Sequence, residues 1–531
     1  MSIECPACGE TVRAEDLFCM FCGAPLKDDT GRLSTQADRY EQMERWGQAV
    51  EARLSLAEHI EDPEERGRQF YAAGVLQQER LRDTAAAARS FDKALDADPT
   101  RLKAFESLDQ LLVDTGDVVE QARSYRRMIR RALDTEAEER VIIALARNLA
   151  DICHTRLKQP QETVDALKLI LDRRPGDMPA LTQAAEAYDQ LGDVNHAAEM
   201  HRRILEIDPR RVESYQSLRR LFLNTERYDA GWCVCRVLSV LGQANADEVS
   251  FYERYATTTP TRAERPLEQG HWPLIDHPLK SPLLDELLAR THDALLTLMA
   301  RQHKALGIKR RRDAIDLADM TRFANVMGYL FEFLPVPQAE MFRSADALGM
   351  QPALLEPPGI LVGPDLLEED LYVLAFVGAR QLVRTRASHL MGSIQTRVAE
   401  RRPFFERLLA TLRATFHFKS RVHDHDNQVR EALQRNLPPR EVQALTELVE
   451  RMNDDAPLHW DAERYLKGID LTADRVGLIF ANDLEKALAI IRSEPATSAA
   501  PSVGERATEL IRYAYSEEYF QVRRLIGHNI D

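Results

Sequence analysis

The sequence has 531 residues, enough for three or four domains of roughly 150 residues each. Hydrophobic residues make up 44% and charged residues 29%, which excludes a wholly disordered chain. The 70 basic and 85 acidic side chains give a formal charge of −15, so the surface as a whole is a poor match for nucleic acid. No apolar run reaches the roughly 18–20 residues that span a bilayer, and the first residues lack the features of a signal peptide. We therefore expect a cytoplasmic location.

Four of the seven cysteines fall in the first 22 residues, in two Cys-x-x-Cys-Gly motifs. Cys5 and Cys8 form the first pair, and Cys19 and Cys22 form the second. Two such turns direct four thiolates to one point, which is the ligand set of a closed tetrahedral zinc site. Residues 1–26 resemble the short zinc ribbons at the front of many bacterial proteins. We expect one structural zinc ion bound by these four cysteines, with redox dithiols or disulfides as the alternative.

A repeated pattern of small and aromatic residues follows the cysteines. Four of these residues have the spacing that is typical of the second helix of a tetratricopeptide repeat: Ala87, Phe91, Ala94 and Pro99. Pro175 and Pro209 are 34 residues apart, which is one full repeat. We expect a leading amphipathic pair and about five helix pairs over residues 36–245, with an insertion or longer helices in 136–174. Stacked repeats of this kind form a superhelix whose concave surface binds extended peptides or partner helices; an irregular helical domain is the alternative.

Residues 246–280 are rich in proline and predict a linker. Beyond it, the stretch 357–363 predicts a short strand, and a long apolar helix follows. Asp-Leu-Thr-Ala-Asp-Arg stands at 470–475. In this order of features, residues 281–492 resemble the zinc metallopeptidases of the CAAX prenyl protease and HtpX type. The resemblance implies a mostly helical domain in which 470–475 is the segment of the third zinc ligand.

The residues that zinc chemistry requires are replaced in this segment. The resemblance places Arg380 and Arg384 at the two histidine positions of the HExxH motif, Gln381 at the general base, and Asp470 at the third ligand. A guanidinium has no lone pair to donate to zinc, and a glutamine amide is not basic. We therefore expect a domain without its catalytic metal and with no catalytic residues. Arg380 and Arg384 are expected to pair with Asp470 or with a carboxylate of a partner, and His389 falls where the family commonly has a further histidine.

Three histidines, His417, His423 and His425, form a His/Asp-rich stretch that we interpret as a polar loop. Residues 493–504 predict a flexible linker, and 505–531 predict a C-terminal helix. The aromatic side chains of this last segment either dock on the body or bind a partner, and the sequence leaves both open.

Together these features predict a mainly α protein with a zinc ribbon, a tetratricopeptide-type solenoid and a metallopeptidase-like domain. Its expected function is that of a non-catalytic adaptor or scaffold that binds other proteins. One alternative is a hydrolase with an atypical site that uses His389 with Asp470, or the histidines of 417–425. The other is a nucleic-acid binder that acts through the ribbon, although residues 10–18 carry three acids and one arginine.

Overall fold

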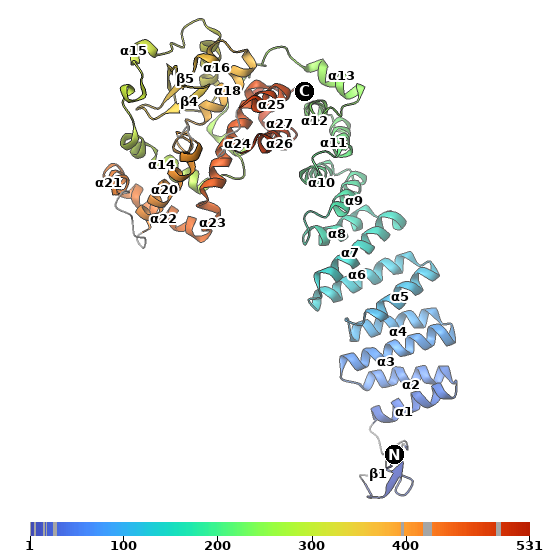
Figure 1. The fold of residues 1–531 in the computed structure, drawn as a ribbon. Coiled ribbons are helices and arrows are strands. Elements are labelled where there is room, and N and C mark those ends of the chain that lie inside the picture. Colours follow the sequence, from blue (N-terminus) through green and yellow to red (C-terminus); the bar gives the residue numbers. More distant parts are fainter. Residues whose placement is uncertain are drawn as a thin grey trace. The chain divides into compact units, whose positions relative to one another are not determined.

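The computed structural model describes residues 2–4, 7–13, 16, 18–24, 29–394, 398–417, 427–494 and 501–531. The chain divides into two compact units, Met1–Asp208 and Pro209–Asp531. Figure 1 shows that helices make up most of both units, which confirms the mainly α fold expected from the sequence. None of the helices in these ranges is long and apolar enough to cross a membrane.

The first unit begins with a hairpin in which β1 (Ser2–Glu4) pairs with β2 (Thr11–Arg13) in antiparallel register. The α-helices that follow in the described residues are α1 (Asp29–Gln42), α2 (Trp46–His59), α3 (Pro63–Leu76), α4 (Thr84–Ala97), α5 (Leu102–Thr115), α6 (Val118–Asp134), α7 (Glu139–Asp151), α8 (Pro160–Leu171), α9 (Met178–Gln190) and α10 (Val194–Ile207). Two π-helical turns, Gln77–Leu81 and Ile152–Leu157, extend α3 and α7.

Each helix pair is closed by a tight turn and by close contact of small side chains. Gly116 in the turn between α5 and α6 has φ 70°, and Gly192 between α9 and α10 has φ 72°, a left-handed backbone that favours glycine. A Cβ atom at Gly74 of α3 would lie 2.7 Å from the ring of Phe91 in α4, so glycine permits this helix contact. The pairs therefore have the short turns and close packing of tetratricopeptide-type repeats.

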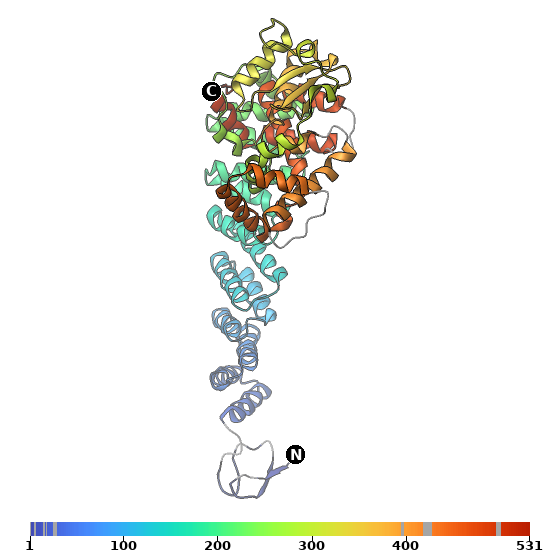
Figure 2. The ribbon, with the colours of Figure 1, turned by 90° about the vertical axis from the view of Figure 1, so that its left-hand side faces the viewer.

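Successive pairs contact one another through both rows of helices. In the row of second helices, Arg131 of α6 donates to Asp92 of α4 at 2.8 Å. In the row of first helices, Gln183 of α9 donates to Asp151 of α7 at 3.1 Å. Figure 2 shows the pairs as successive layers of blue to cyan helices. The predicted α-solenoid is confirmed for this unit.

The extra residues predicted in 136–174 lie partly there. The π-helical turn Ile152–Leu157 adds six residues after α7, and α6, outside that range, has 17 residues against 14 in α10. Longer helices therefore account for the irregular repeat length.

The second unit begins with a further helix pair, α11 (Val212–Asn224) and α12 (Tyr228–Val240). Its other helices in the described residues are α13 (Ala246–Tyr255), α14 (Pro282–Met299), α15 (Arg310–Asp313), α16 (Arg322–Phe333), α17 (Pro364–Leu367), α18 (Leu371–Val383), α19 (Leu390–Ser393), α20 (Val398–Phe416), α21 (Asn427–Asn436), α22 (Pro439–Asp454), α23 (Ala456–His459), α24 (Ala462–Ala481), α25 (Leu484–Ser493), α26 (Val503–Ala514) and α27 (Glu517–Ile526). Its strands are β3 (Glu340–Arg343), β4 (Met350–Ala353) and β5 (Gly359–Val362).

The small sheet of this unit has β5 at its centre, parallel to β3 and antiparallel to β4. The strand predicted at 357–363 is therefore present. Ile360 and Val362 of β5 are fully buried, and α17 and α18 follow the strand directly along the chain.

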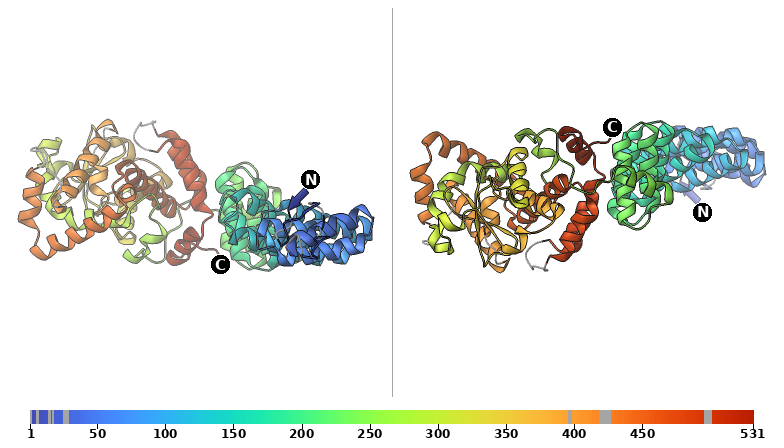
Figure 3. Two further views of the ribbon diagram at one scale, coloured as in Figure 1. Left: turned by 90° about the horizontal axis from the view of Figure 1, so that it is seen from below. Right: turned by 90° about the horizontal axis from the view of Figure 1, so that it is seen from above.

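Helices α18 and α24 pack side by side in the interior of the second unit. Figure 1 labels both helices, and Figure 3 shows the ribbon from below and from above. A Cβ atom at Gly477 of α24 would lie 2.7 Å from the ring of Phe376 in α18, so the glycine permits this close approach. Because both helices are buried on nearly all sides, the polar side chains that they carry must find partners inside the protein.

Part of the segment 246–280, predicted to be a linker, is helical and packed. It contains α13, and Leu267, Trp272 and Ile275 are at most 5% exposed. After α13 the prolines limit regular structure to the 3-10 helix Gln269–Leu274, but they do not prevent apolar side chains from being buried. The C-terminal segment 505–531 forms two helices, α26 and α27, and residues 495–500 of the predicted linker 493–504 lie outside the described residues.

Candidate functional site

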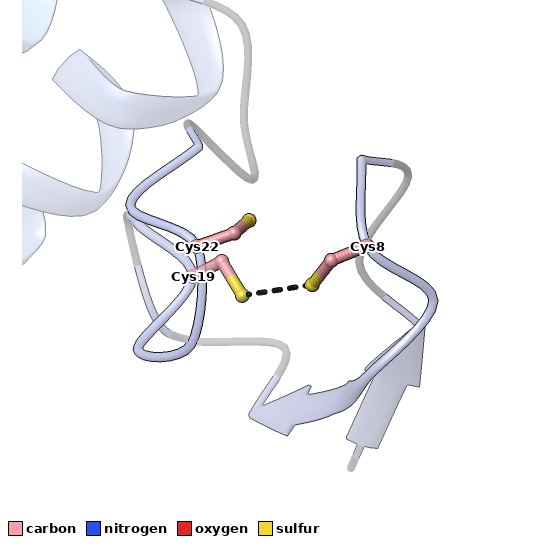
Figure 4. A group of neighbouring side chains, drawn as sticks. All are labelled: Cys8, Cys19 and Cys22. Atoms are coloured by element: carbon pink, nitrogen blue, oxygen red, sulfur yellow. Dashed lines mark hydrogen bonds between the residues drawn. The ribbon is translucent and has the colours of Figure 1, made fainter.

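Three thiols of the N-terminal segment lie together: Cys8 from the turn of the hairpin, and Cys19 and Cys22 from the turn that follows β2 (Figure 4). Their sulfur atoms are all within 4.8 Å of one another, and Sγ of Cys8 lies 3.5 Å from Sγ of Cys19. Cys5, the fourth predicted ligand, lies outside the described residues. The hairpin and the turn after it therefore bring together the three predicted ligands that the structure describes.

The spacing of these thiols fits a metal ion better than a disulfide. Zinc–sulfur bonds of about 2.3 Å in tetrahedral geometry place sulfur atoms about 3.8 Å apart, whereas a disulfide requires about 2.05 Å. The separation of 3.5 Å between Cys8 and Cys19 is close to the first value. In the described part of the chain, no other group of three clustered metal-ligating side chains is found.

The backbone around Cys19 favours its thiolate form. Burial raises the pKa of the Cys19 thiol, but hydrogen bonds from the backbone of Cys22 and Phe21 and from the neighbouring thiols outweigh burial and lower the pKa to about 7. Gly23 then turns the chain at φ 74°, and its N–H donates to the Cys19 carbonyl at 2.9 Å. Because the thiolate is the form that binds a metal, this turn is suited to a metal ligand.

A second polar site lies between α18 and α24. Nη2 of Arg384 donates to Oδ1 of Asp470 at 3.0 Å, and Nη1 of Arg380 lies 3.5 Å from Oδ1 of Asp474. Asp470 is 2% exposed and Asp474 1%. The predicted pairing of Arg384 with Asp470 is confirmed. Arg380 instead pairs with Asp474, one helical turn further along α24. Residues four apart lie on the same face of a helix, and these faces of α18 and α24 pack against each other.

Each of these aspartates has a second guanidinium partner from another helix. Arg401 of α20 donates from Nη1 and Nη2 to Asp470 at 2.6 and 3.1 Å. Arg506 of α26 donates from Nε and Nη2 to Asp474 at 2.7 and 2.8 Å. With one further carboxylate, these side chains form what we call the arginine ladder: Arg380, Arg384, Arg401, Arg506, Asp470, Asp474 and Glu494.

Glu494 bridges two of the arginines. It accepts a hydrogen bond from Arg506 at 2.6 Å and another from Arg380. Burial opposes its ionisation, but the two guanidiniums lower the pKa of the Glu494 carboxyl to about 2. Burial and neighbouring guanidiniums lower the pKa of Arg384 to about 10, against the attraction of its aspartate. Glu494 is thus held ionised, and Arg384 is a cation that its surroundings stabilise poorly.

Within the described ranges, the hydrogen bonds of His389 go to groups other than Asp470. His389 is fully buried, with Nδ1 3.1 Å from the carbonyl of Val383 and Nε2 3.5 Å from Arg386. Burial, followed by nearby positive charges, lowers the pKa of His389 well below its ordinary value. The oxygens of Asp470 accept from arginines instead, so the pair that an atypical hydrolase would use is not assembled.

His417 lines a pocket of about 580 Å³ between α20 and the start of α24. Arg413, which lies 5.3 Å over the ring of Trp460, and Asp461 also line it, so its charges are mixed. His423 and His425 lie outside the described residues.

The C-terminal helices dock on the last helix pair within the second unit. The rings of Phe222 in α11 and Phe520 in α27 meet edge to face at 5.6 Å. Arg523 of α27 donates to both carboxylate oxygens of Asp229 in α12, at 2.8 to 3.2 Å, and Tyr519 is fully buried. The aromatic side chains of this segment therefore pack on the body of the protein, which resolves the alternative that the sequence left open.

Four members of the arginine ladder were not predicted as partners: Asp474, Arg401, Arg506 and Glu494. Arg401 is 69 residues from Asp470, Arg506 is 32 from Asp474, and Glu494 is 114 from Arg380. An arginine or glutamate in a charged helical stretch carries no local signal of burial, so only the tertiary packing identifies these partners.

No family model and no curated protein matches the sequence. Solved structures that are similar to part of the chain include a MamA protein at 17% identity, which covers 35% of this chain and 88% of its own with a TM-score of 0.22. A tetratricopeptide repeat protein from Parabacteroides merdae has 12% identity, coverage of 41% and 80%, and a TM-score of 0.20. The TPR2AB domain of yeast Sti1, solved as a pHSP90 complex, has 14% identity, coverage of 42% and 97%, and a TM-score of 0.19. At these scores the similarities carry no argument about function.

Proposed function

We propose that this chain is a non-catalytic adaptor that binds other proteins. The stack of helix pairs from α1 to α10 is the observation that carries the proposal. Such an array buries its apolar faces between repeats and leaves one row of helices to bind an extended peptide or a partner helix. The proposed setting is the bacterial cytoplasm.

The proposed domain organisation follows the sequence. A zinc ribbon occupies 1–26, tetratricopeptide-like repeats 36–245, a pseudopeptidase domain 281–492, and a C-terminal helical segment 505–531. The segments 246–280 and 493–504 connect these parts.

We further propose that Cys5, Cys8, Cys19 and Cys22 hold one structural zinc ion. Four thiolates close the tetrahedral shell and leave no position for water or substrate, so the ion stabilises the small hairpin and supplies no catalysis. The distance between Cys8 and Cys19 and the lowered pKa of Cys19 support this assignment.

The absence of catalysis is inferred from the arginine ladder. At the positions where the resembling metallopeptidases carry zinc ligands, Arg380 and Arg384 donate to carboxylates. A guanidinium is a donor without an accepting lone pair, so neither side chain binds a metal. The carboxylate at 470 accepts from two arginines, which opposes a role as a metal ligand.

Metal analysis of the purified full chain tests both the structural zinc site and the absence of a catalytic metal. We expect one zinc per chain, lost when the four cysteines are changed to serine together. A second transition metal that stays bound after those changes would favour the hydrolase alternative.

Charge reversal on the helix rows tests the adaptor surface. The variant carries Glu106→Lys and Glu186→Lys on the exposed face of the first helices α5 and α9. The matched control carries Asp165→Lys and Glu199→Lys on the second helices α8 and α10, with the same change of charge. We expect proteins captured from a cell extract by the native chain to be lost with the first variant and kept with the control. Identical capture by both would show that the first helices are not the binding surface.

A further inference from the structure

The arginine ladder has two halves of similar design but unequal charge. In one half, Arg380 and Arg506 share Asp474, and Glu494 joins the same two guanidiniums a second time. The other half has Asp470 shared between two guanidiniums in the same way. Among the described residues, no second carboxylate joins that pair.

The second half of the ladder consists of Arg384, Arg401 and Asp470. Arg401 donates from Nη1 and Nη2 to Asp470 and from Nε to the carbonyl of Gly392 at 2.6 Å. Arg384 makes a single hydrogen bond to Asp470, and its buried Nε has no partner. All three nitrogen atoms of Arg401 thus donate hydrogen bonds, whereas within the described part of the chain only Nη2 of Arg384 does so.

The charge count of the ladder shows the same asymmetry. It contains four guanidiniums and three carboxylates, so one positive charge in this buried region is not balanced within the ladder. A charge that is largely removed from water is costly unless it is paired. The half that contains Glu494 is neutral, so the unbalanced charge belongs to the half that contains Arg384.

We propose that Arg384 and Arg401 form a binding site for a small oxyanion, a carboxylate or phosphate group, which takes the place that Glu494 has in the other half. A guanidinium binds such groups with two parallel hydrogen bonds, and Arg384 has the donors for it. This site does not depend on the proposed adaptor function.

Solvent reaches this half of the ladder. The side chain of Arg384 is 22% exposed, close to the 26% of Glu494, whereas Asp470 is 2% exposed. An oxyanion can therefore approach Arg384 from solvent, as the Glu494 carboxylate approaches its own arginines.

Gln381 adds a neutral polar group on the same helix, three residues before Arg384. It is 6% exposed, and its Oε1 has no hydrogen-bond partner in the structure. The amide of a glutamine also carries an NH₂ group, which donates to an oxyanion. Residues three apart on a helix lie on the same side of it, so a glutamate at 381 would bring a carboxylate into the neighbourhood of Arg384 and compete with the ligand.

The test uses the purified full chain and measures the midpoint of thermal unfolding in acetate and in phosphate, against chloride at constant ionic strength. We expect at least one of the two to raise the midpoint in a saturable way, by about 2 °C at ten times its dissociation constant. Equilibrium dialysis with the radiolabelled anion should give one site per chain. The anion that binds identifies the ligand as a carboxylate or a phosphate.

Three variants separate this site from general salt effects. Arg384→Gln and Gln381→Glu should each reduce anion binding at least tenfold. Arg290→Gln should leave anion binding unchanged, because Arg290 of α14 lies outside the ladder and pairs with Glu286 of the same helix and with Glu441 of α22. If the Arg384→Gln chain does not fold, Gln381→Glu carries the comparison. The proposal is overturned if neither anion binds the native chain, or if binding is the same in the native chain and Gln381→Glu.

Discussion

The unequal halves of the arginine ladder predict that its arginines contribute very unequally to stability. Arg506 makes three hydrogen bonds to the buried Asp474 and the partly exposed Glu494. Arg506→Gln therefore leaves each of these carboxylates with one guanidinium, that of Arg380. Removing one partner of a buried ion pair costs about 3–5 kcal/mol, and we expect about 4 kcal/mol. Arg384→Gln removes one hydrogen bond and also the unbalanced positive charge, so we expect a loss of about 1 kcal/mol or less.

Urea unfolding followed by tryptophan fluorescence measures this difference. Three of the four tryptophans belong to the second unit, so the signal reports mainly on it. A gap of about 3 kcal/mol is a factor of about 100 in the unfolding equilibrium constant. Arg290→Gln, on a more exposed ion pair, serves as a control with an expected loss below about 1 kcal/mol. Equal losses for Arg384→Gln and Arg506→Gln would refute the charge count on which this reasoning rests.

Three further outcomes are expected. The pKa of Glu494 is about 2 in the folded chain, against an ordinary 4.5. The ionised carboxylate therefore contributes roughly 3 kcal/mol to the free energy of unfolding above pH 4.5, and this contribution is lost as the pH falls toward 2. Glu494→Gln should flatten this part of a stability–pH curve. Gly74→Ala should destabilise the first unit by about 1–3 kcal/mol, because the new Cβ atom would lie 2.7 Å from an aromatic ring. Gly47 has open space around it, so Gly47→Ala should be neutral or stabilising in thermal unfolding. Arg523→Gln should lower the free energy of unfolding by about 3–5 kcal/mol and speed hydrogen exchange in α12. The neighbouring Arg524 is exposed, so Arg524→Gln should change that free energy by less than about 0.5 kcal/mol. Equal effects would mean that α27 is not held by its buried ion pair.

Features with a local pattern could be predicted from the sequence. The spacing of Cys8, Cys19 and Cys22 predicted that their thiols meet, and the helical periodicity predicted the stacked pairs of the first unit. The pairing of Arg384 with Asp470 was predicted through a resemblance, and the structure contains it. The resemblance to a metallopeptidase domain itself stays a prediction.

Features that depend on the meeting of distant segments could not be predicted. The proline-rich segment before α14 gave no periodic signal, yet Trp272 is buried. Nor did any local pattern distinguish Arg506 from the exposed arginines around it, because its partners lie on other helices.

Taken alone, the sequence predicts the stacked helix pairs of the first unit, the gathering of the thiols and the positions that cannot bind zinc. These features follow from short-range spacing and from the chemistry of single side chains. The tertiary structure decides how the buried charges are shared. Four arginines contact two aspartates of α24 and Glu494, so the ladder carries one more guanidinium than it has carboxylates. Electrostatic balance in the interior depends on which side chains are neighbours in space, and the order of residues along the chain does not contain that information directly.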